Sequence, residues 1–224
     1  MAKRAETIRG LYRALSGALG PSRWWPGETP FEVAVGAILT QNTNWKNVEK
    51  AIANLKDAHA LTARGLRAMP PARLEELIRP AGYFRIKTKR LMEFLDFLET
   101  ESALEIEVLA DQELHRLRPK LLAVRGIGPE TADSILLYAL GKPTFVVDAY
   151  TVRMFSRHGL IPEETDYHEV QDIAQSALPC EAADYNEFHA LIVRAAKEWC
   201  RKTRPLCSLC PARALLPNPD EPPS

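Results

Sequence analysis

Hydrophobic residues recur every three or four positions along most of the chain, which is the spacing of one face of an α-helix. Leu11, Leu15 and Leu19 form the first such face, after a start near Thr7. Later runs predict helices that begin near Pro30, Asn44, Pro71 and Asp111, a long helix that ends near Ser102, and helices over about 149–158, 170–178 and 185–200. Prolines separate the runs, as helix boundaries require. No segment alternates for long enough to anchor a sheet, so the sequence predicts an all-α fold.

The composition is that of a globular protein: 46% of the 224 residues are hydrophobic, enough for one or two compact cores. No apolar run approaches the ~18 residues that a transmembrane helix needs. The first residues begin an amphipathic pattern instead of a signal sequence. We therefore expect a cytoplasmic monomer without a membrane partner.

The formal net charge is zero, whereas most nucleic-acid-binding domains are basic. The charges are unevenly distributed, however. Basic residues gather at 85–90 and 201–204, and acidic residues gather at 99–113 and 163–172. A neutral protein can still present one basic face, although each cluster is also compatible with an ordinary solvated surface.

Two apolar stretches, 121–124 and 132–140, flank the sequence Gly126-Ile127-Gly128. Two helices joined by such a turn present backbone N–H groups that bind an anion, here a DNA phosphate. Glycine suits the turn because it allows a positive φ and a close approach of the phosphate. The alternative is an ordinary helical hairpin with a glycine cap. Asp148, which follows two valines, is either a catalytic acid or the N-cap of the next helix, and both can hold.

Together with Gly141-Lys142-Pro143 and 146–148, this block resembles the helix-hairpin-helix, Gly/Pro loop and aspartate of the endonuclease III superfamily of DNA glycosylases. The resemblance covers roughly 31–210. It implies two helical lobes with a DNA-binding cleft between them, and double-stranded DNA with a damaged base as partner. One lobe is 24–141, with the helix-hairpin-helix. The other combines 1–23 with 142–224, including a C-terminal cysteine loop.

The resemblance also implies chemical roles. In the superfamily the acid at the position of Asp148 stabilises the positive charge that builds on the sugar and orients a water molecule. Members that also cut the strand carry a lysine amine two residues after the second hairpin glycine. Glu130 stands there in this sequence. The chain is thus expected to be a monofunctional DNA N-glycosylase of base excision repair, without AP-lyase activity. Glu130 can equally serve as a first-turn acid that complements the helix dipole.

Trp24, Trp25 and Trp45 are candidates for the pocket of the flipped base. An indole holds a cationic base better than a neutral one, by roughly 0.5–2 kcal/mol. These tryptophans, together with Glu130 and Asp148, are similar to the set of residues in the 3-methyladenine DNA glycosylase branch, which implies alkylated purines as substrates. Alternatively the tryptophans anchor the core. Uracil or thymine in a mismatch is the alternative substrate, and a non-catalytic damage-binding module is the alternative class.

Two further residues correspond to positions that keep the duplex open in the superfamily. Gln41 matches a residue that enters the gap left by the flipped nucleotide, where its amide both donates and accepts. Tyr83 matches a wedge that parts the stack on the opposite strand. Both are also compatible with ordinary loop residues.

Cys200, Cys207 and Cys210 match three of the four ligands of the superfamily's iron–sulfur loop, and Leu216 stands at the fourth position. Cys180 is too distant, since a helix of ~15 residues places it roughly 20 Å away. A [4Fe–4S] cluster is possible with Asp220 or water as fourth ligand, or the cluster has been lost. Zinc is less favoured, because it also needs four ligands and no histidine lies nearby in the sequence.

Overall fold

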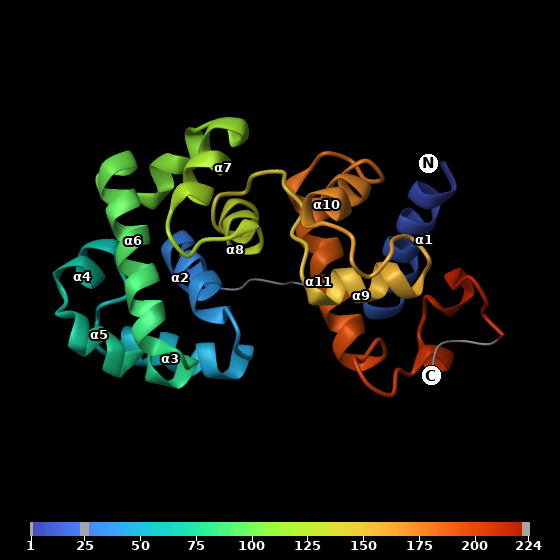
Figure 1. Cartoon of the computed structure of the whole chain (residues 1–224), viewed down its shortest axis with the longest axis horizontal. Helices are drawn as coiled ribbons and strands as arrows, with labels where there is room; N and C mark the ends of the chain where they lie inside the picture. Colours follow the sequence, from blue (N-terminus) through green and yellow to red (C-terminus); the bar gives the residue numbers. More distant parts are fainter. Residues whose placement is uncertain (1, 23–26, 221–224) are drawn as a thin grey trace. The chain divides into compact units, whose positions relative to one another are not determined.

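The computed structural model describes residues 2–22 and 27–220, in which helix accounts for 67% of the structure and no strand occurs. This confirms the all-α prediction. The chain forms two compact units: a terminal unit made of Met1–Trp24 with Pro143–Ser224, and a central unit, Trp25–Lys142 (Figure 1). No helix among the described residues combines the length and the apolar character that crossing a bilayer requires.

The central unit is built around one apolar helix. Its helices are α2 (Pro30–Thr40), α3 (Trp45–Asp57), α4 (Ala63–Ala68), α5 (Pro71–Leu77), α6 (Phe84–Ser102), α7 (Leu114–Ala123) and α8 (Pro129–Ser134), with 3₁₀ turns over Arg79–Ala81 and Ile106–Asp111. Helix α2 is buried along most of its length and contacts α3, α6 and α8. A helix that is apolar on nearly all sides needs such enclosure.

Side-chain caps set the start of the central helices. Thr29 Oγ1 accepts a hydrogen bond from the Glu32 amide at 3.1 Å, and Asn44 Oδ1 accepts one from the Asn47 amide at 3.1 Å. The second apolar stretch of the hairpin is less regular than predicted. Helix α8 ends at Ser134 and continues as a π turn over Ile135–Ala139.

The terminal unit combines α1 (Ala2–Leu19), α9 (Ala149–Arg157), α10 (Tyr167–Gln175) and α11 (Ala182–Glu198), with 3₁₀ turns over Cys207–Leu209 and Arg213–Leu215. Helix α11 contacts both α1 and α9. The expected start of the first helix near Thr7 is wrong. Thr7 Oγ1 donates back to the Lys3 carbonyl at 3.1 Å, so this side chain lies within the helix and does not cap it.

The β-branched stretch before Asp148 belongs to no helix or strand, and its backbone groups pair with side chains of α10. The Phe145 N–H donates to Gln175 Oε1 at 2.9 Å, and Gln171 Nε2 donates to the Phe145 carbonyl at 2.6 Å. The Val147 N–H donates to the Tyr167 hydroxyl at 3.4 Å. Buried backbone groups need such partners, so α10 fixes the segment that delivers Asp148.

A bidentate ion pair joins the two helices of the hairpin in the central unit. Arg118 on α7 donates from Nε and Nη2 to the two carboxylate oxygens of Asp133 on α8, at 2.8 and 2.9 Å. The Asp133 side chain has no exposed surface. Two parallel charge-assisted bonds fix relative orientation as well as distance, so this pair sets how α7 meets α8.

We expect Asp133→Asn to destabilise the protein by about 3–5 kcal/mol, because the Arg118 guanidinium then lacks its carboxylate in a poorly hydrated site. Urea unfolding of the full chain measures the change. Glu105→Gln is the matched control, since its pair with Arg64 is exposed and should contribute less than about 1 kcal/mol. Equal effects of the two substitutions would contradict the assignment.

Candidate active site and nucleic-acid interface

The two glycines of the hairpin turn differ in why they are glycine. Gly126 has a φ of +87°, and a Cβ there would lie 2.5 Å from Cγ of Arg90. Gly128 has a φ of −90°, and a Cβ there would meet nothing within 4 Å. The expected need for a positive φ therefore applies to Gly126 and not to Gly128. At Gly128 the space beside the backbone is open, which suits the expected close approach of a phosphate.

The N–H groups of the turn are not equally available for an anion. The Ile127 N–H donates to the Val124 carbonyl at 3.1 Å, and the Ile127 side chain is buried. The amides of Gly126 and Gly128 make no hydrogen bond with other described residues. Gly128 also caps α8 without a side-chain bond. Ile127 thus anchors the turn, and the two glycine amides remain as donors.

Gln41, at the C-terminal end of α2, braces this turn. Its Nε2 donates to the Gly126 carbonyl at 3.0 Å and to Thr131 Oγ1 at 2.9 Å. Its Oε1 accepts a hydrogen bond from Arg90. Both ends of the amide are therefore engaged within the protein. To bind an orphaned base, as the sequence predicts, Gln41 must exchange these bonds. Arg90 was visible in the sequence only as part of a basic cluster.

Tyr83 sits in a strained, exposed loop between the 3₁₀ turn and α6. It has a φ of 45° and a ψ of 31°, a left-handed conformation that is unusual for a bulky residue. Its side chain is 65% exposed. Strain of this kind is found at functional sites where the surrounding structure enforces it.

A buried lysine holds the backbone just before Tyr83. Lys87, only 1% exposed, donates from Nζ to the Ala81 carbonyl at 2.7 Å, two residues before Tyr83. Burial, together with the nearby Arg90 guanidinium, lowers the pKa of Lys87 to about 8. Sequence reasoning missed this role, because lysine at that position looked like one more surface charge.

Trp45 begins α3 and is partly buried against the central core. Its ring lies over α2, where a Cβ added to Gly36 would be 3.5 Å from the indole Cη2. Part of the indole therefore has a packing role. Trp24 and Trp25 lie outside the described residues.

Asp148 is the N-cap of α9. Its Oδ1 accepts the N–H groups of Tyr150 and Thr151 at 2.9 and 2.8 Å. Its Oδ2 lies 3.4 Å from Nε2 of His189 on α11. The Asp148 side chain is 13% exposed, so one oxygen is committed to the helix while the other faces an imidazole.

The carboxylate of Asp148 is held ionised. Burial raises its pKa, but the His189 imidazole and the Thr151 N–H outweigh burial and leave the pKa of Asp148 below its ordinary value. His189 is itself buried and meets Phe145 edge-on, with 6.2 Å between ring centroids. Sequence reasoning missed His189, because forty residues separate it from Asp148 and only the fold brings them together.

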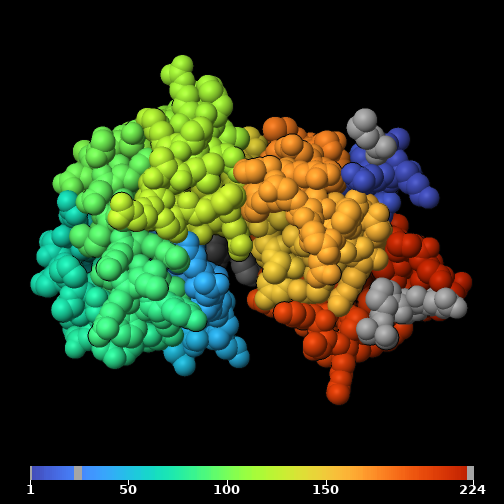
Figure 2. Space-filling model, viewed as in Figure 1, coloured from blue at the N-terminus to red at the C-terminus, as the bar shows by residue number. Residues whose placement is uncertain are grey.

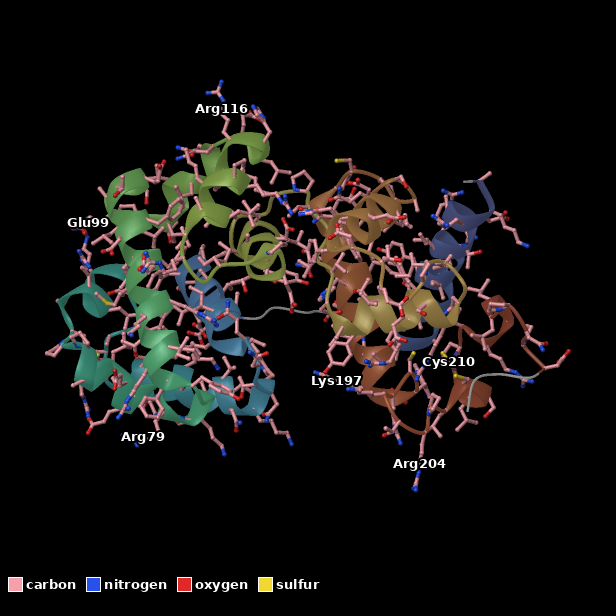
Figure 3. All side chains as sticks on the ribbon, in the orientation of Figure 1. Arg79, Glu99, Arg116, Lys197, Arg204 and Cys210 are labelled. Carbon is pink, nitrogen blue, oxygen red and sulfur yellow. The ribbon has the colours of Figure 1, made fainter. Side chains whose placement is uncertain are left out.

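The three C-terminal cysteines line one pocket in the terminal unit, together with Leu216 (Figure 3 labels Cys210). Arg157 donates to Cys200 Sγ at 3.2 Å. Burial, with the neighbouring thiols, raises the pKa of Cys207 and Cys210. Among the described residues, no group of side chains converges tightly enough for a single metal ion.

A histidine distant in the sequence also lines this pocket. His158, at the end of α9, lies more than forty residues before Cys200 in the chain, and the fold brings it to the same pocket. Asp220, the oxygen ligand considered above, does not line the pocket. Cys180 is exposed.

The segment after α11 lies on the surface of the terminal unit, where Figure 2 draws it in red. Its basic residues, 201–204, are exposed, and Arg204 extends into solvent (Figure 3). Arg157 donates to the Arg201 carbonyl at 2.8 Å, which ties this basic loop to α9.

A helix-hairpin-helix turn and a helix-capping aspartate define a class of DNA repair proteins, and sequence comparison agrees. Residues 35–180 match the HhH-GPD superfamily of base excision DNA repair proteins, and the chain belongs to that family. It is 48% identical over 209 residues to a protein of Methanocaldococcus jannaschii named "Putative DNA repair glycosylase MJ1434", covering 93% of this chain and 94% of that one.

Solved structures have the same fold. Helicobacter pylori 3-methyladenine DNA glycosylase (MagIII), bound to 1,N6-ethenoadenine, is 29% identical, with a TM-score of 0.74 and coverage of 87% of this chain and 97% of that one. A trapped endonuclease III–DNA covalent intermediate is 21% identical, with a TM-score of 0.82 and 96% coverage of both chains. Endonuclease III of Thermotoga maritima is 27% identical in sequence over 81% of this chain and 79% of its own.

We expect His189→Leu to shift the pH dependence of base excision. If Asp148 is the catalytic carboxylate, the rate falls as the pH drops through its pKa. Loss of His189 removes the largest contribution that lowers the pKa of Asp148, so that pKa rises and the acid limb of the rate profile moves to higher pH. Single-turnover excision across a pH series measures this.

The control for this shift is His115→Leu, an exposed histidine on α7, which should leave the profile in place. An acid limb that stays where it is in His189→Leu would show that the imidazole does not act on Asp148.

Proposed function

We propose that this DNA glycosylase is monofunctional: it hydrolyses the N-glycosidic bond of a damaged base in double-stranded DNA and leaves the strand intact. Two carboxylates carry the proposal. Asp148 is ionised, and Glu130 stands at the position where strand-cutting relatives have lysine. That DNA binds in a cleft between two lobes stays a prediction from the resemblance.

Asp148 suits the chemistry of hydrolysis. As the glycosidic bond breaks, positive charge develops on the sugar, and a fixed anion lowers the energy of that state. Its Oδ1 is held by two backbone N–H groups. The other oxygen is oriented by His189. A carboxylate fixed in this way does not need to reorganise during the reaction, and it can accept a proton from an attacking water.

Glu130 is exposed in the first turn of α8. A carboxylate cannot form a Schiff base with the sugar, so a water molecule must attack the anomeric carbon. We assign Glu130 no covalent step. Its charge near the N-terminus of α8 favours the helix dipole.

We propose an alkylated purine such as 3-methyladenine as the substrate. Trp45 offers an indole face at the start of α3, and Trp24 and Trp25 are the further candidates. The fixed charge of an alkylated purine strengthens contact with an electron-rich ring and makes the base a good leaving group. The likeness to MagIII, whose structure holds 1,N6-ethenoadenine, supports the same substrate class.

The DNA contacts follow from the central unit. The Gly126 and Gly128 amides are available to bind a phosphate, and Ile127 holds their turn. Tyr83, exposed on its strained loop, is suited to part the base stack. Gln41 would fill the gap once it releases the hairpin turn.

We also propose that Cys200, Cys207 and Cys210 hold a [4Fe–4S] cluster. All three line one pocket, and an arginine N–H contacts the Cys200 sulfur, which suits the negative charge of an iron–thiolate centre. When bound, the cluster would serve a structural purpose. The adjoining basic residues, 201–204, would then be held for contact with the phosphate backbone.

We expect Asp148→Asn to slow excision by roughly a hundredfold to ten-thousandfold, because an amide keeps the helix cap but carries no charge. Binding to lesion DNA should persist, which fluorescence anisotropy measures separately from single-turnover excision. Wild-type turnover by this variant would refute the mechanism.

Borohydride treatment during turnover separates hydrolysis from lyase chemistry. An amine nucleophile gives a covalent protein–DNA adduct on reduction, whereas hydrolysis gives none. Endonuclease III is the positive control. An adduct with the wild-type protein would contradict the absence of lyase activity, whatever the Asp148 result.

We expect Trp45→Ala to slow excision of 3-methyladenine about 2- to 30-fold more than excision of a neutral damaged base, which corresponds to a cation–π contribution of about 0.5–2 kcal/mol. A panel of lesion oligonucleotides measures both rates. Trp45→Phe keeps an aromatic face and should lose less. If uracil or a mismatched thymine were the preferred base, the proposed substrate class would be wrong.

A further inference from the structure

His158 is a buried histidine with one uncommitted ring nitrogen. It follows α9, is 8% exposed, and its Nδ1 lies 2.8 Å from the Met154 carbonyl. Because a carbonyl only accepts, Nδ1 carries the proton in the neutral ring and Nε2 carries a lone pair. Among the described residues, no group hydrogen-bonds to this Nε2.

A buried lone pair without a donor is costly. The Ala212 carbonyl lies near enough to the ring to favour its protonated form, so a metal at Nε2 would have to displace a proton there. An imidazole that donates one N–H to a backbone carbonyl and leaves the other nitrogen bare has the usual arrangement of a metal-ligating histidine. The His158 ring is therefore prepared for a metal.

The pocket that His158 lines is the one that contains the three cysteines. Leu216 lines it too, and this is the residue that stands where relatives have their fourth cysteine. A leucine side chain cannot bind iron. The fold thus gathers three cysteines, His158 and the leucine at the family's fourth position around one pocket.

We propose that Nε2 of His158 is the fourth ligand of the cluster, giving it Cys₃His ligation. The inference rests on the cluster proposed above. A single zinc ion is the alternative occupant of the pocket that these four residues line, and the iron and sulfide content separates the two. Each corner of a cube is a separate iron, so its ligands stand apart. The three thiols lose their protons on binding, and the Arg157 guanidinium beside Cys200 offsets their charge.

The first experiment counts iron and sulfide in full-length protein reconstituted without oxygen. The wild type should contain them in the ratio of a [4Fe–4S] cube and absorb visible light. His158→Ala should lose the iron at that corner, giving the electron paramagnetic resonance signal of a [3Fe–4S] cluster when oxidised, or lose the cluster. His168→Ala, an exposed histidine on α10, should match the wild type.

A second variant separates ligation from folding. In His158→Ala/Leu216→Cys a thiolate occupies the family's position, and we expect the full iron content to return. Thiolate in place of imidazole should also lower the reduction potential relative to the wild type. With ¹⁵N-labelled histidine, pulsed resonance of the reduced cluster should detect a directly bound nitrogen in the wild type and none in the double variant.

The outcomes distinguish this inference from the cluster proposal. A wild-type protein that takes up no iron and sulfide, or binds only zinc, would overturn both. A complete cluster in His158→Ala, with the wild-type signal and no nitrogen coupling in the wild type, would leave the cluster proposal standing and overturn ligation by His158.

Discussion

The buried carboxylate of Asp148 is the constraint around which the terminal unit is organised. A buried anion is tolerated only when its charge is compensated, and here the compensation comes from two backbone N–H groups of α9 and from His189 on α11. Supplying both requires that α9 and α11 pack together. It also requires that the preceding extended segment be pinned, which α10 does through Gln171 and Gln175. The packing of α9, α10 and α11 thus favours the ionised form of the Asp148 side chain.

The central unit also contains a buried charge with a partner, and here the pair fixes the orientation of two helices. The Arg118–Asp133 pair fixes α7 against α8, and Gln41 holds the turn between them from α2. These contacts leave the Gly126 and Gly128 amides available while Ile127 is committed. A phosphate site made from backbone groups has no charged side chain of its own, so its precision must come from the packing around it. A phosphate site of this kind needs no excess of basic residues, so it is compatible with a net charge of zero.

The sequence was sufficient for features that depend on local spacing. Helical periodicity predicted most of the helices, and the cap residues Asn44 and Asp148 mark real helix starts. Features that depend on tertiary partners could not be predicted. Asp133 looks like any helix acid until its bidentate arginine is seen, and Lys87 looks like a surface charge until it is found buried. Even the two hairpin glycines differ only in three dimensions, since Gly126 has a positive φ and a neighbour in the place of a Cβ, whereas Gly128 has neither.

Helix α9 carries residues of two candidate sites. Asp148 caps its start and His158 follows its end, about 15 Å apart at the rise of an α-helix. The carboxylate is favoured at the positive end of the helix. At the other end Arg157 contacts both a cysteine sulfur and the basic loop. The proposed catalytic carboxylate and the proposed cluster pocket thus lie at opposite ends of one short helix. If the cysteines hold a cluster, its purpose at this end of α9 is structural, and it takes no part in the chemistry proposed for Asp148.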